Sequence, residues 1–125
     1  MASWWGSFVR EGTPESQLDP ALHPLRHELV LRKDTYSAFR NTSLDRFLKK
    51  RAARTVVLCG TMTHICVDTT ARDAFLHGYD VVVVEDACAA KHASLHDASL
   101  QCLAHAVARV VATNAVVMQL RAGAP

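Results

Sequence analysis

The chain has 125 residues, of which half are hydrophobic and 21% are charged, a length and composition typical of one modest globular domain. Its 14 Lys and Arg and 12 Asp and Glu leave a formal net charge of +2, which argues against nucleic acid or a membrane surface as a partner. The N-terminus has no basic region followed by an apolar run, and no apolar stretch approaches the ~20 residues of a spanning helix, so we expect a cytoplasmic protein.

The first 26 residues hold three of the four prolines and predict loop, although Trp4, Trp5 and Phe8 need burial. Beyond them, apolar patterns predict alternating strands and helices. The predicted strands are Glu28–Lys33, Thr55–Gly60, Asp80–Glu85 and Arg109–Thr113, and the predicted helices begin near Thr42 and span 65–77 and 94–107, with a last helical turn over 116–120. This alternation indicates a parallel α/β sheet with right-handed crossovers, in which ligands bind at the carboxyl ends of the strands.

The predicted helices carry further local signals. Thr42 and Asp45 form a variant of the capping box. The basic run Lys49–Arg51, with Arg54, complements a helix C-terminus and the solvent better than it suits nucleic acid. The inward faces are predicted to consist of Val67, Ala71, Ala74 and Phe75 in helix 65–77, and of Leu95, Ala98, Cys102, Leu103 and Ala106 in helix 94–107.

Cys66 follows the buried strand Thr55–Gly60 and stands in the first turn of the next helix. The helix dipole and unpaired N–H groups there stabilise a thiolate and could hold an oxyanion, which makes Cys66 a candidate nucleophile. The alternative is a small buried hydrophobic residue. Lys33, at the end of its predicted strand, would stabilise a neighbouring thiolate, or it is a solvated lysine at a strand end.

The other cysteines suggest less chemistry. No Cys-x-x-Cys pair occurs, which disfavours a disulfide framework, a zinc knuckle and redox use. Cys59 lies in a buried strand and Cys102 on an inward helix face, so both are predicted to belong to the core. His92, His96 and Asp97 could suggest a metal site, but polar surface and capping describe them better, and we expect no metal and no cofactor.

Several motifs occur together in one order: Lys33-Asp-Thr-Tyr-Ser-Ala-Phe39, then Val57-Leu-Cys-Gly-Thr-Met-Thr-His-Ile-Cys-Val67, then Glu85-Asp-Ala-Cys88. The chain resembles the isochorismatase-like cysteine hydrolases over nearly its whole length. The resemblance implies a three-layer α/β/α, Rossmann-like fold with a mainly parallel sheet. It also implies an Asp, Lys and Cys triad, of which Lys33 and Cys66 are the matching members.

The same resemblance implies a cis peptide at Thr61–Met62, with the backbone N–H groups of Met62 and Cys66 as the oxyanion hole. Family members that cleave isochorismate have glycine at the cysteine position, so the chain is more similar to the amidohydrolase branch. There a thiolate attacks a small amide and forms a thioester that water hydrolyses. By their positions, Tyr36 and Phe39 after Lys33 would wall the substrate pocket, and His64 would line it or shuttle a proton. For Tyr36 and Phe39 the alternative is simple packing, and for His64 a loop position without a role.

The Asp of the family triad ends the family's first strand, and no residue here matches it. The acidic residues before Lys33 are Glu11, Glu15, Asp19 and Glu28, none of which follows an apolar run. We therefore expect residues 1–125 to form one partial domain that lacks the upstream βαβ portion. The four predicted strands would be the third to sixth of a sheet ordered 3-2-1-4-5-6.

Without the missing strands, Lys33 would lie about two strand spacings, of roughly 4.8 Å each, from where it belongs unless the sheet closes up. Either the gap closes by pairing Glu28–Lys33 onto Thr55–Gly60, or another chain fills it, or the chain folds poorly. We expect the chain to turn over its small-molecule substrate at a strongly reduced rate or not at all. We also expect it to form a homo-oligomer. The alternative is an inactive fragment that associates only with itself or with a complementing chain.

Overall fold

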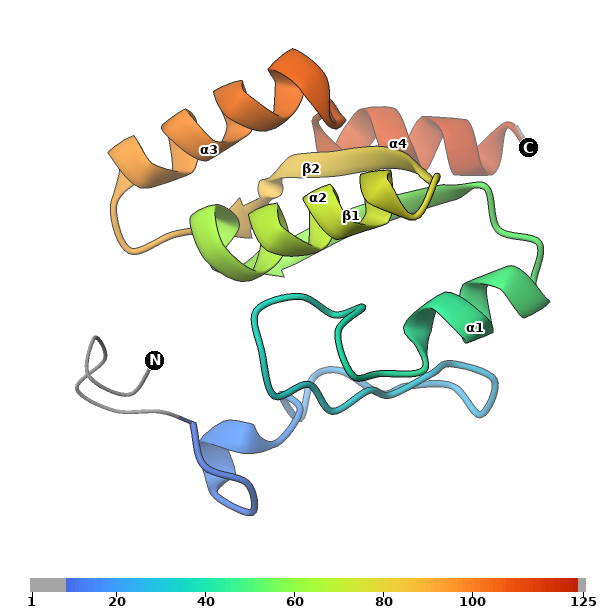
Figure 1. Cartoon of the computed structure of the whole chain (residues 1–125), viewed down its shortest axis with the longest axis vertical. Helices are drawn as coiled ribbons and strands as arrows, with labels where there is room; N and C mark the ends of the chain where they lie inside the picture. Colours follow the sequence, from blue (N-terminus) through green and yellow to red (C-terminus); the bar gives the residue numbers. More distant parts are fainter. Residues whose placement is uncertain (1–8, 124–125) are drawn as a thin grey trace. The chain divides into compact units, whose positions relative to one another are not determined.

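The computed structural model describes residues 9–123 and divides the chain into two compact units, 9–30 and 31–123 (Figure 1). The first unit holds one short 3-10 turn, η2 (Pro14–Ser16), and buries no residue in it. Thr13, which precedes this turn, donates a hydrogen bond from its hydroxyl to the carbonyl oxygen of Arg10 at 2.8 Å. The three aromatic residues expected to need burial, at positions 4, 5 and 8, lie outside the described residues.

The second unit is built on a parallel sheet of strands β1 (Thr55–Thr61), β2 (Asp80–Ala89) and β3 (Arg109–Val111), in the order β1-β2-β3. The strand predictions at these three places are confirmed, with β2 longer and β3 shorter than expected. The sequence of β2 is a continuous run of valines because this middle strand is buried on both faces. Val81 to Val84 of β2 are all at most 5% exposed.

Helices lie on both faces of the sheet. Their bounds are α1 (Leu44–Lys50), the π-helix η3 (Thr63–Val67), α2 (Asp68–Leu76), α3 (Ala93–Ala106) and α4 (Thr113–Arg121). Val81 and Val83 pack with α2 and α3 in one core, and Val82 and Val84 point to the opposite face. α4 contacts β2 there, and Figure 1 shows it behind the sheet while α2 lies in front. The chain therefore has the three-layer α/β/α architecture that the resemblance implies.

The predicted inward face of helix 65–77 is largely right. Val67, Ala71 and Ala74 are at most 6% exposed and pack against the sheet. Phe75 is an exception, since half of its surface remains exposed.

The predicted inward face of helix 94–107 is wrong for four of its five residues. Leu103 is fully buried as expected, and the other buried residues of α3 are Ser99 and Leu100. Leu95, Ala98, Cys102 and Ala106 are exposed. The helix is rotated because Ser99 and His96 have hydrogen-bond partners beneath it, which an apolarity pattern does not register.

The predicted strand Glu28–Lys33 does not form; these residues are irregular. A strand needs a ladder of hydrogen bonds from a neighbour, and in the described residues β1 pairs with β2 alone. Burial offers no substitute, because Val30 is 58% exposed. The first of the three outcomes considered above, pairing onto β1, is therefore not observed.

Within residues 9–123, little covers the face of β1 opposite the core. Val57 is 47% exposed, although its neighbour Val82 in β2 is 5% exposed. Cys59, two residues on, is also exposed, so its predicted place in the core is wrong. Both residues stand on an outer strand, where apolar side chains lose the cover that a further neighbour would supply.

α1 begins close to where it was predicted, but its capping differs. Ser43 is the N-cap, and the hydroxyl of Thr42 accepts a hydrogen bond from the first helical N–H at 3.2 Å. Asp45 does not reach back to close a capping box. Its carboxylate accepts from Lys49 Nζ at 2.8 Å and from the Tyr79 hydroxyl at 2.9 Å. The first of these bonds lowers the pKa of the Asp45 carboxyl.

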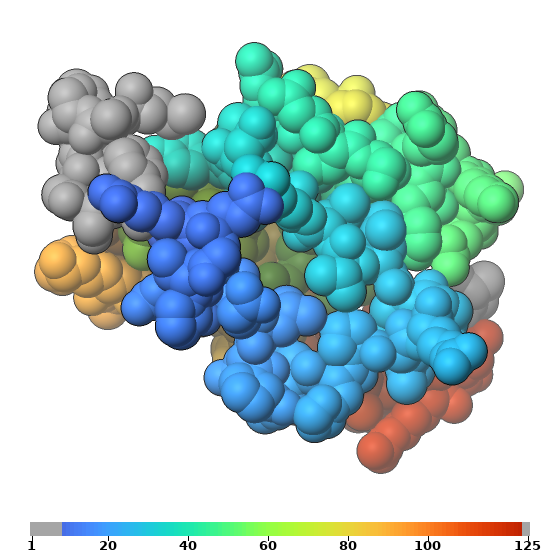
Figure 2. Space-filling model, turned by 90° about the horizontal axis from the view of Figure 1, so that it is seen from below, coloured from blue at the N-terminus to red at the C-terminus, as the bar shows by residue number. Residues whose placement is uncertain are grey.

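The basic residues around the end of α1 are all exposed, and this helix lies at the surface in Figure 2. Lys49 is paired with Asp45, and the Arg51 guanidinium stacks over the Phe47 ring at 3.7 Å. These local contacts fit the solvated role expected for the run. Within residues 9–123, no helix combines the length and apolarity needed to cross a membrane.

Candidate active site

Cys66 lies where β1 ends and the next helix starts. The Thr61–Met62 peptide bond is cis, at the position that the resemblance implied. The π-helix η3 follows and carries Cys66 as its fourth residue, two residues before α2 begins. The N–H groups of Ile65 and Val67 donate to the Met62 carbonyl oxygen at 3.0 and 3.2 Å. Cys66 thus stands at the carboxyl edge of the sheet, where parallel α/β folds bind their ligands.

Lys33 reaches this cysteine from far away in the sequence. Its Nζ donates to Cys66 Sγ at 3.4 Å and to the Thr35 carbonyl oxygen at 2.9 Å. The expected displacement of Lys33 by two strand spacings is therefore wrong. An irregular segment brings the ammonium to the thiol without any sheet pairing.

The segment that carries Lys33 is held by contacts further along it. The N–H of Ala38 donates to the Thr70 hydroxyl of α2 at 3.1 Å. Phe39 is buried in the core, stacked on His77 with ring centroids 4.9 Å apart. These two anchors position the loop from Lys33 to Phe39 against the helix that follows Cys66.

The pair of Lys33 and Cys66 combines a fixed positive charge with a half-buried thiol. An ammonium at this distance stabilises a thiolate over a neutral thiol. Within residues 9–123, neither side chain has a carboxylate among its hydrogen-bond or ion-pair partners. The described site therefore holds the two members that the sequence matched, without a carboxylate beside them.

The residues proposed to line a substrate pocket have different surroundings. Phe39 belongs to the core, so the packing alternative describes it. Tyr36 is half-buried. His64 is also half-buried, and its Nδ1 is buried without a hydrogen-bond partner in the described part of the chain. His64 is two residues before Cys66 in the sequence, so this buried nitrogen without a partner belongs to the same turn as the thiol.

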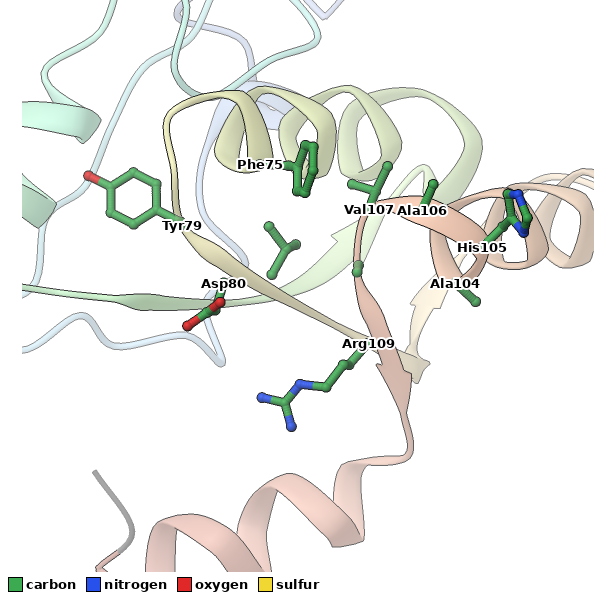
Figure 3. A pocket seen from close by; sticks show the side chains of 10 residues that line it. Phe75, Tyr79, Asp80, Ala104, His105, Ala106, Val107 and Arg109 are labelled. Carbon is green, nitrogen blue, oxygen red and sulfur yellow. The ribbon is translucent and has the colours of Figure 1, made fainter.

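A hollow of about 330 Å³ lies elsewhere, at the amino ends of β2 and β3 (Figure 3). Asp80 and Arg109, the first residues of these strands, line it together with Phe75. This is the opposite end of the strands from Cys66, and ligands of parallel sheets bind at the carboxyl end. None of the predicted site residues lines the hollow, which we therefore do not assign to the chemistry.

The sequence did not predict a partly buried group of polar side chains that supports the turn carrying Cys66. Thr63 is fully buried, and its hydroxyl oxygen lies 2.8 Å from Nδ1 of His96 in α3. The Ser99 hydroxyl donates to Asp68 Oδ2 at 2.8 Å, and Arg72 Nε donates to Asp68 Oδ1 at 2.6 Å. The available sequence signal was the spacing of His96 and Ser99, which puts both on the helix face that also carries Leu103.

The histidines that could suggest a metal site at α3 have structural roles instead. In residues 9–123 no group of three or more His, Cys, Asp or Glu side chains is placed to hold a metal ion. His92 is the N-cap of α3 but makes no side-chain capping bond. His96 is bonded to Thr63. Asp86 caps α4: its Oδ1 accepts from the N–H and the hydroxyl of Thr113, each at 2.7 Å, and these bonds lower the pKa of the Asp86 carboxyl.

The remaining cysteines do not join the site. Burial raises the pKa of the Cys88 thiol, which makes this cysteine a poorer nucleophile near neutral pH. Cys102 is exposed on α3, so its predicted place in the core is wrong. It provides an exposed reference thiol on the same chain.

Comparisons with known proteins agree on one family. The Isochorismatase domain family model matches residues 2–115. An uncharacterized isochorismatase family protein of Bacillus subtilis (strain 168), YddQ, is 37% identical over 72% of this chain and 50% of its own length. Nicotinamidase 3 of Arabidopsis thaliana is 35% identical over 85% of this chain and 54% of its own.

Two further relatives extend the comparison. The ureidoacrylate amidohydrolase RutB of Acinetobacter baylyi is 36% identical over 76% of this chain and 39% of its own length. The crystal structure of a cysteine hydrolase from Pseudomonas syringae pv. phaseolicola 1448A superposes with a TM-score of 0.86 at 30% identity, covering 90% of this chain and 58% of that one. The chain thus spans about half the length of the relatives it matches.

Proposed function

The chain belongs to the isochorismatase family, and from that premise we propose that it is a cysteine hydrolase for the C–N bond of a small amide, with a thioester on Cys66 as intermediate. The observation that carries the proposal is the 3.4 Å contact from Lys33 Nζ to Cys66 Sγ at the carboxyl edge of β1. By their names, the nicotinamidase and ureidoacrylate amidohydrolase relatives act on amides.

In the proposed reaction, the Cys66 thiolate attacks the carbonyl carbon of the amide. A C–S bond forms, and the π-electron pair of the carbonyl moves to its oxygen, which the N–H groups of Met62 and Cys66 would hold. When the pair returns, the C–N bond breaks and the amine leaves with a proton. Water then attacks the thioester, releasing the carboxylic acid and the thiol. Lys33 would offset the negative charge on sulfur and oxygen.

Two of these steps need a proton carrier that the described contacts do not include. Amine departure needs an acid, and thioester hydrolysis needs a base to activate water. Residues 9–123 place no carboxylate in contact with Cys66 or Lys33. We therefore propose that its turnover of amides is strongly reduced, and that acylation outpaces deacylation only for a substrate whose leaving group needs no proton.

A p-nitrophenyl ester separates these steps, because its phenolate leaves without a proton. We expect a burst of about one equivalent of p-nitrophenolate per chain, followed by a slow phase. Cys66→Ala should abolish the burst. Cys102→Ala, which removes an exposed thiol of the same chain, should leave it intact. A burst that survives Cys66→Ala would overturn the proposal.

The uncovered face of β1 supports a second candidate function, association without chemistry. Val57 is 47% exposed and Cys59 is exposed beside it, on a strand that pairs on one side in the described residues. The backbone edge of such a strand can pair with another chain, and the same chain can cover the exposed side chains. We propose a homo-oligomer formed through this face. Sedimentation velocity should show concentration-dependent association that Val57→Lys removes, and association unchanged by that substitution would contradict the proposal.

A further inference from the structure

We propose that His96 of α3 is a positioning residue for the nucleophile, acting through Thr63. This inference rests on the proposed role of Cys66. Thr63 is 0% exposed, and its hydroxyl oxygen lies 2.8 Å from His96 Nδ1. No other hydrogen bond of this hydroxyl occurs in the described residues, so its placement depends on the histidine.

The bond between Thr63 and His96 affects Cys66 because both Thr63 and Cys66 belong to the same short turn. Thr63 is the first residue of η3, and Cys66 is the fourth. The turn is short, with Ile65 and Val67 both bonded back to the carbonyl oxygen of Met62. A displacement of Thr63 is therefore transmitted to the backbone N–H of Cys66 and to its sulfur, because few freely rotating bonds separate them.

α3 also holds the far end of the same segment. Ser99, three residues after His96, is buried and donates to Asp68 Oδ2 at 2.8 Å, with a longer contact of 3.4 Å to the Thr63 carbonyl oxygen. Asp68 is in turn oriented by Arg72 of its own helix. One helix face thus ties down residues 63 and 68, and Cys66 lies between them.

The proposed role is to hold geometry rather than to exchange protons with a substrate. Removing His96 leaves the fully buried Thr63 hydroxyl unpaired, and removing that hydroxyl leaves Nδ1 of the half-buried His96 without its partner, so the turn must move to satisfy these groups. The oxyanion donors and the sulfur then lose their alignment. Steps that need that alignment should suffer most, since a misplacement of about 1 Å can cost about a hundredfold in rate.

Two reactions of the same thiol distinguish alignment from general damage. Acylation by a p-nitrophenyl ester needs the sulfur and the oxyanion donors together, whereas alkylation by iodoacetamide needs an accessible thiolate alone. In Thr63→Val and His96→Ala we expect acylation of Cys66 to slow about tenfold, with alkylation changed by less than about threefold. The double variant should be no slower than the slower single variant, because both remove one bond.

Conservative variants provide the rescue. Thr63→Ser keeps the hydroxyl, and His96→Asn places an amide atom where Nδ1 stood, so both should acylate within about threefold of the unaltered chain. His105→Ala is the matched control, since His105 is an exposed histidine of the same helix. Circular dichroism and the thermal midpoint verify that each variant folds. If His96→Ala does not fold, the pair Thr63→Val and Thr63→Ser tests the same bond.

The outcomes separate the two claims. Unchanged acylation in folded Thr63→Val and His96→Ala, or equal losses in His105→Ala, would overturn the positioning role while Cys66 remained the nucleophile. Equal losses of acylation and alkylation would also overturn it, because they indicate a loss of thiolate rather than of alignment. An unaltered chain that acylates at no preferred cysteine would overturn the proposed function and this inference together.

Discussion

Replacing Lys33 by Met removes the positive charge that contacts the candidate nucleophile. The two charged atoms would stand 3.4 Å apart. In a medium as polar as water, unit charges at that separation interact by about 1.2 kcal/mol, which corresponds to a factor of about seven in an equilibrium or rate constant. Lys33 is exposed, so the water-like value applies and salt screens it further. We therefore expect Lys33→Met to slow alkylation of Cys66 about five- to sevenfold near neutral pH.

The assay is iodoacetamide labelling followed by peptide-resolved mass spectrometry, with exposed Cys102 as the internal reference. Lys33→Arg keeps the charge and should stay near the unaltered rate. Lys49→Met removes the same net charge from α1, where Lys49 is paired with Asp45, and should leave Cys66 unaffected. In about 1 M salt the effect of Lys33→Met should shrink. If Lys33→Met alkylates at the unaltered rate, or if Lys49→Met is equally slow, the electrostatic argument is refuted.

Three further predictions concern the frame around the site. Leu103→Ala empties a fully buried position and should lower the free energy of unfolding by about 3 kcal/mol in urea titrations; a loss below about 1 kcal/mol would contradict the packing described. Bonds from Thr113 lower the pKa of Asp86, so their stabilisation is present above its ordinary pKa and lost as the pH falls below about 4. Asp86→Asn should therefore flatten the acid decline in stability, whereas Asp97→Asn, on exposed α3 surface, should leave it unchanged. Thr70→Val removes an anchor of the lysine loop and should slow alkylation of the site cysteine toward the Lys33→Met rate, and an unchanged rate would show that the anchor is dispensable.

The strands were predictable where a pattern is decided by burial alone. The run Val81–Val84 could be placed because a central parallel strand is buried on both faces and needs no polar partner. The strand prediction for Glu28–Lys33 is wrong because a strand depends on a hydrogen-bonding neighbour that the residues themselves do not encode. The prediction that Cys59 belongs to the core is wrong for a related reason, since little in the described residues covers this face of β1.

The rotation of α3 shows a different limit. Leu95 and Cys102 have the apolarity expected of an inward face, yet both are exposed, and Ser99 is buried in their place. A serine is buried at little cost only when a partner such as Asp68 accepts its hydrogen bond. That partner lies 31 residues away in the chain, so periodicity could not reveal it.

The site itself was partly predictable. Cys66 could be placed at the carboxyl end of β1 from the strand and helix pattern, and its motif matched a family. The contact with Lys33 depends on a loop anchored by Phe39 and Thr70, which strand prediction misread. His96 was assigned to surface or capping because its partner, a buried hydroxyl, belongs to a turn that only the folded chain brings beneath α3.

The chemical identity of the acylated residue decides whether Cys66 is the nucleophile. The unaltered chain is incubated with a p-nitrophenyl ester and digested, and each cysteine peptide is weighed before and after treatment with neutral hydroxylamine, which cleaves thioesters. We expect one acyl group per chain, on the peptide that contains Cys66, and its loss on treatment. An acyl group spread over Cys59, Cys66 and Cys102, or a stable adduct elsewhere, would contradict the role of Cys66 as the nucleophile.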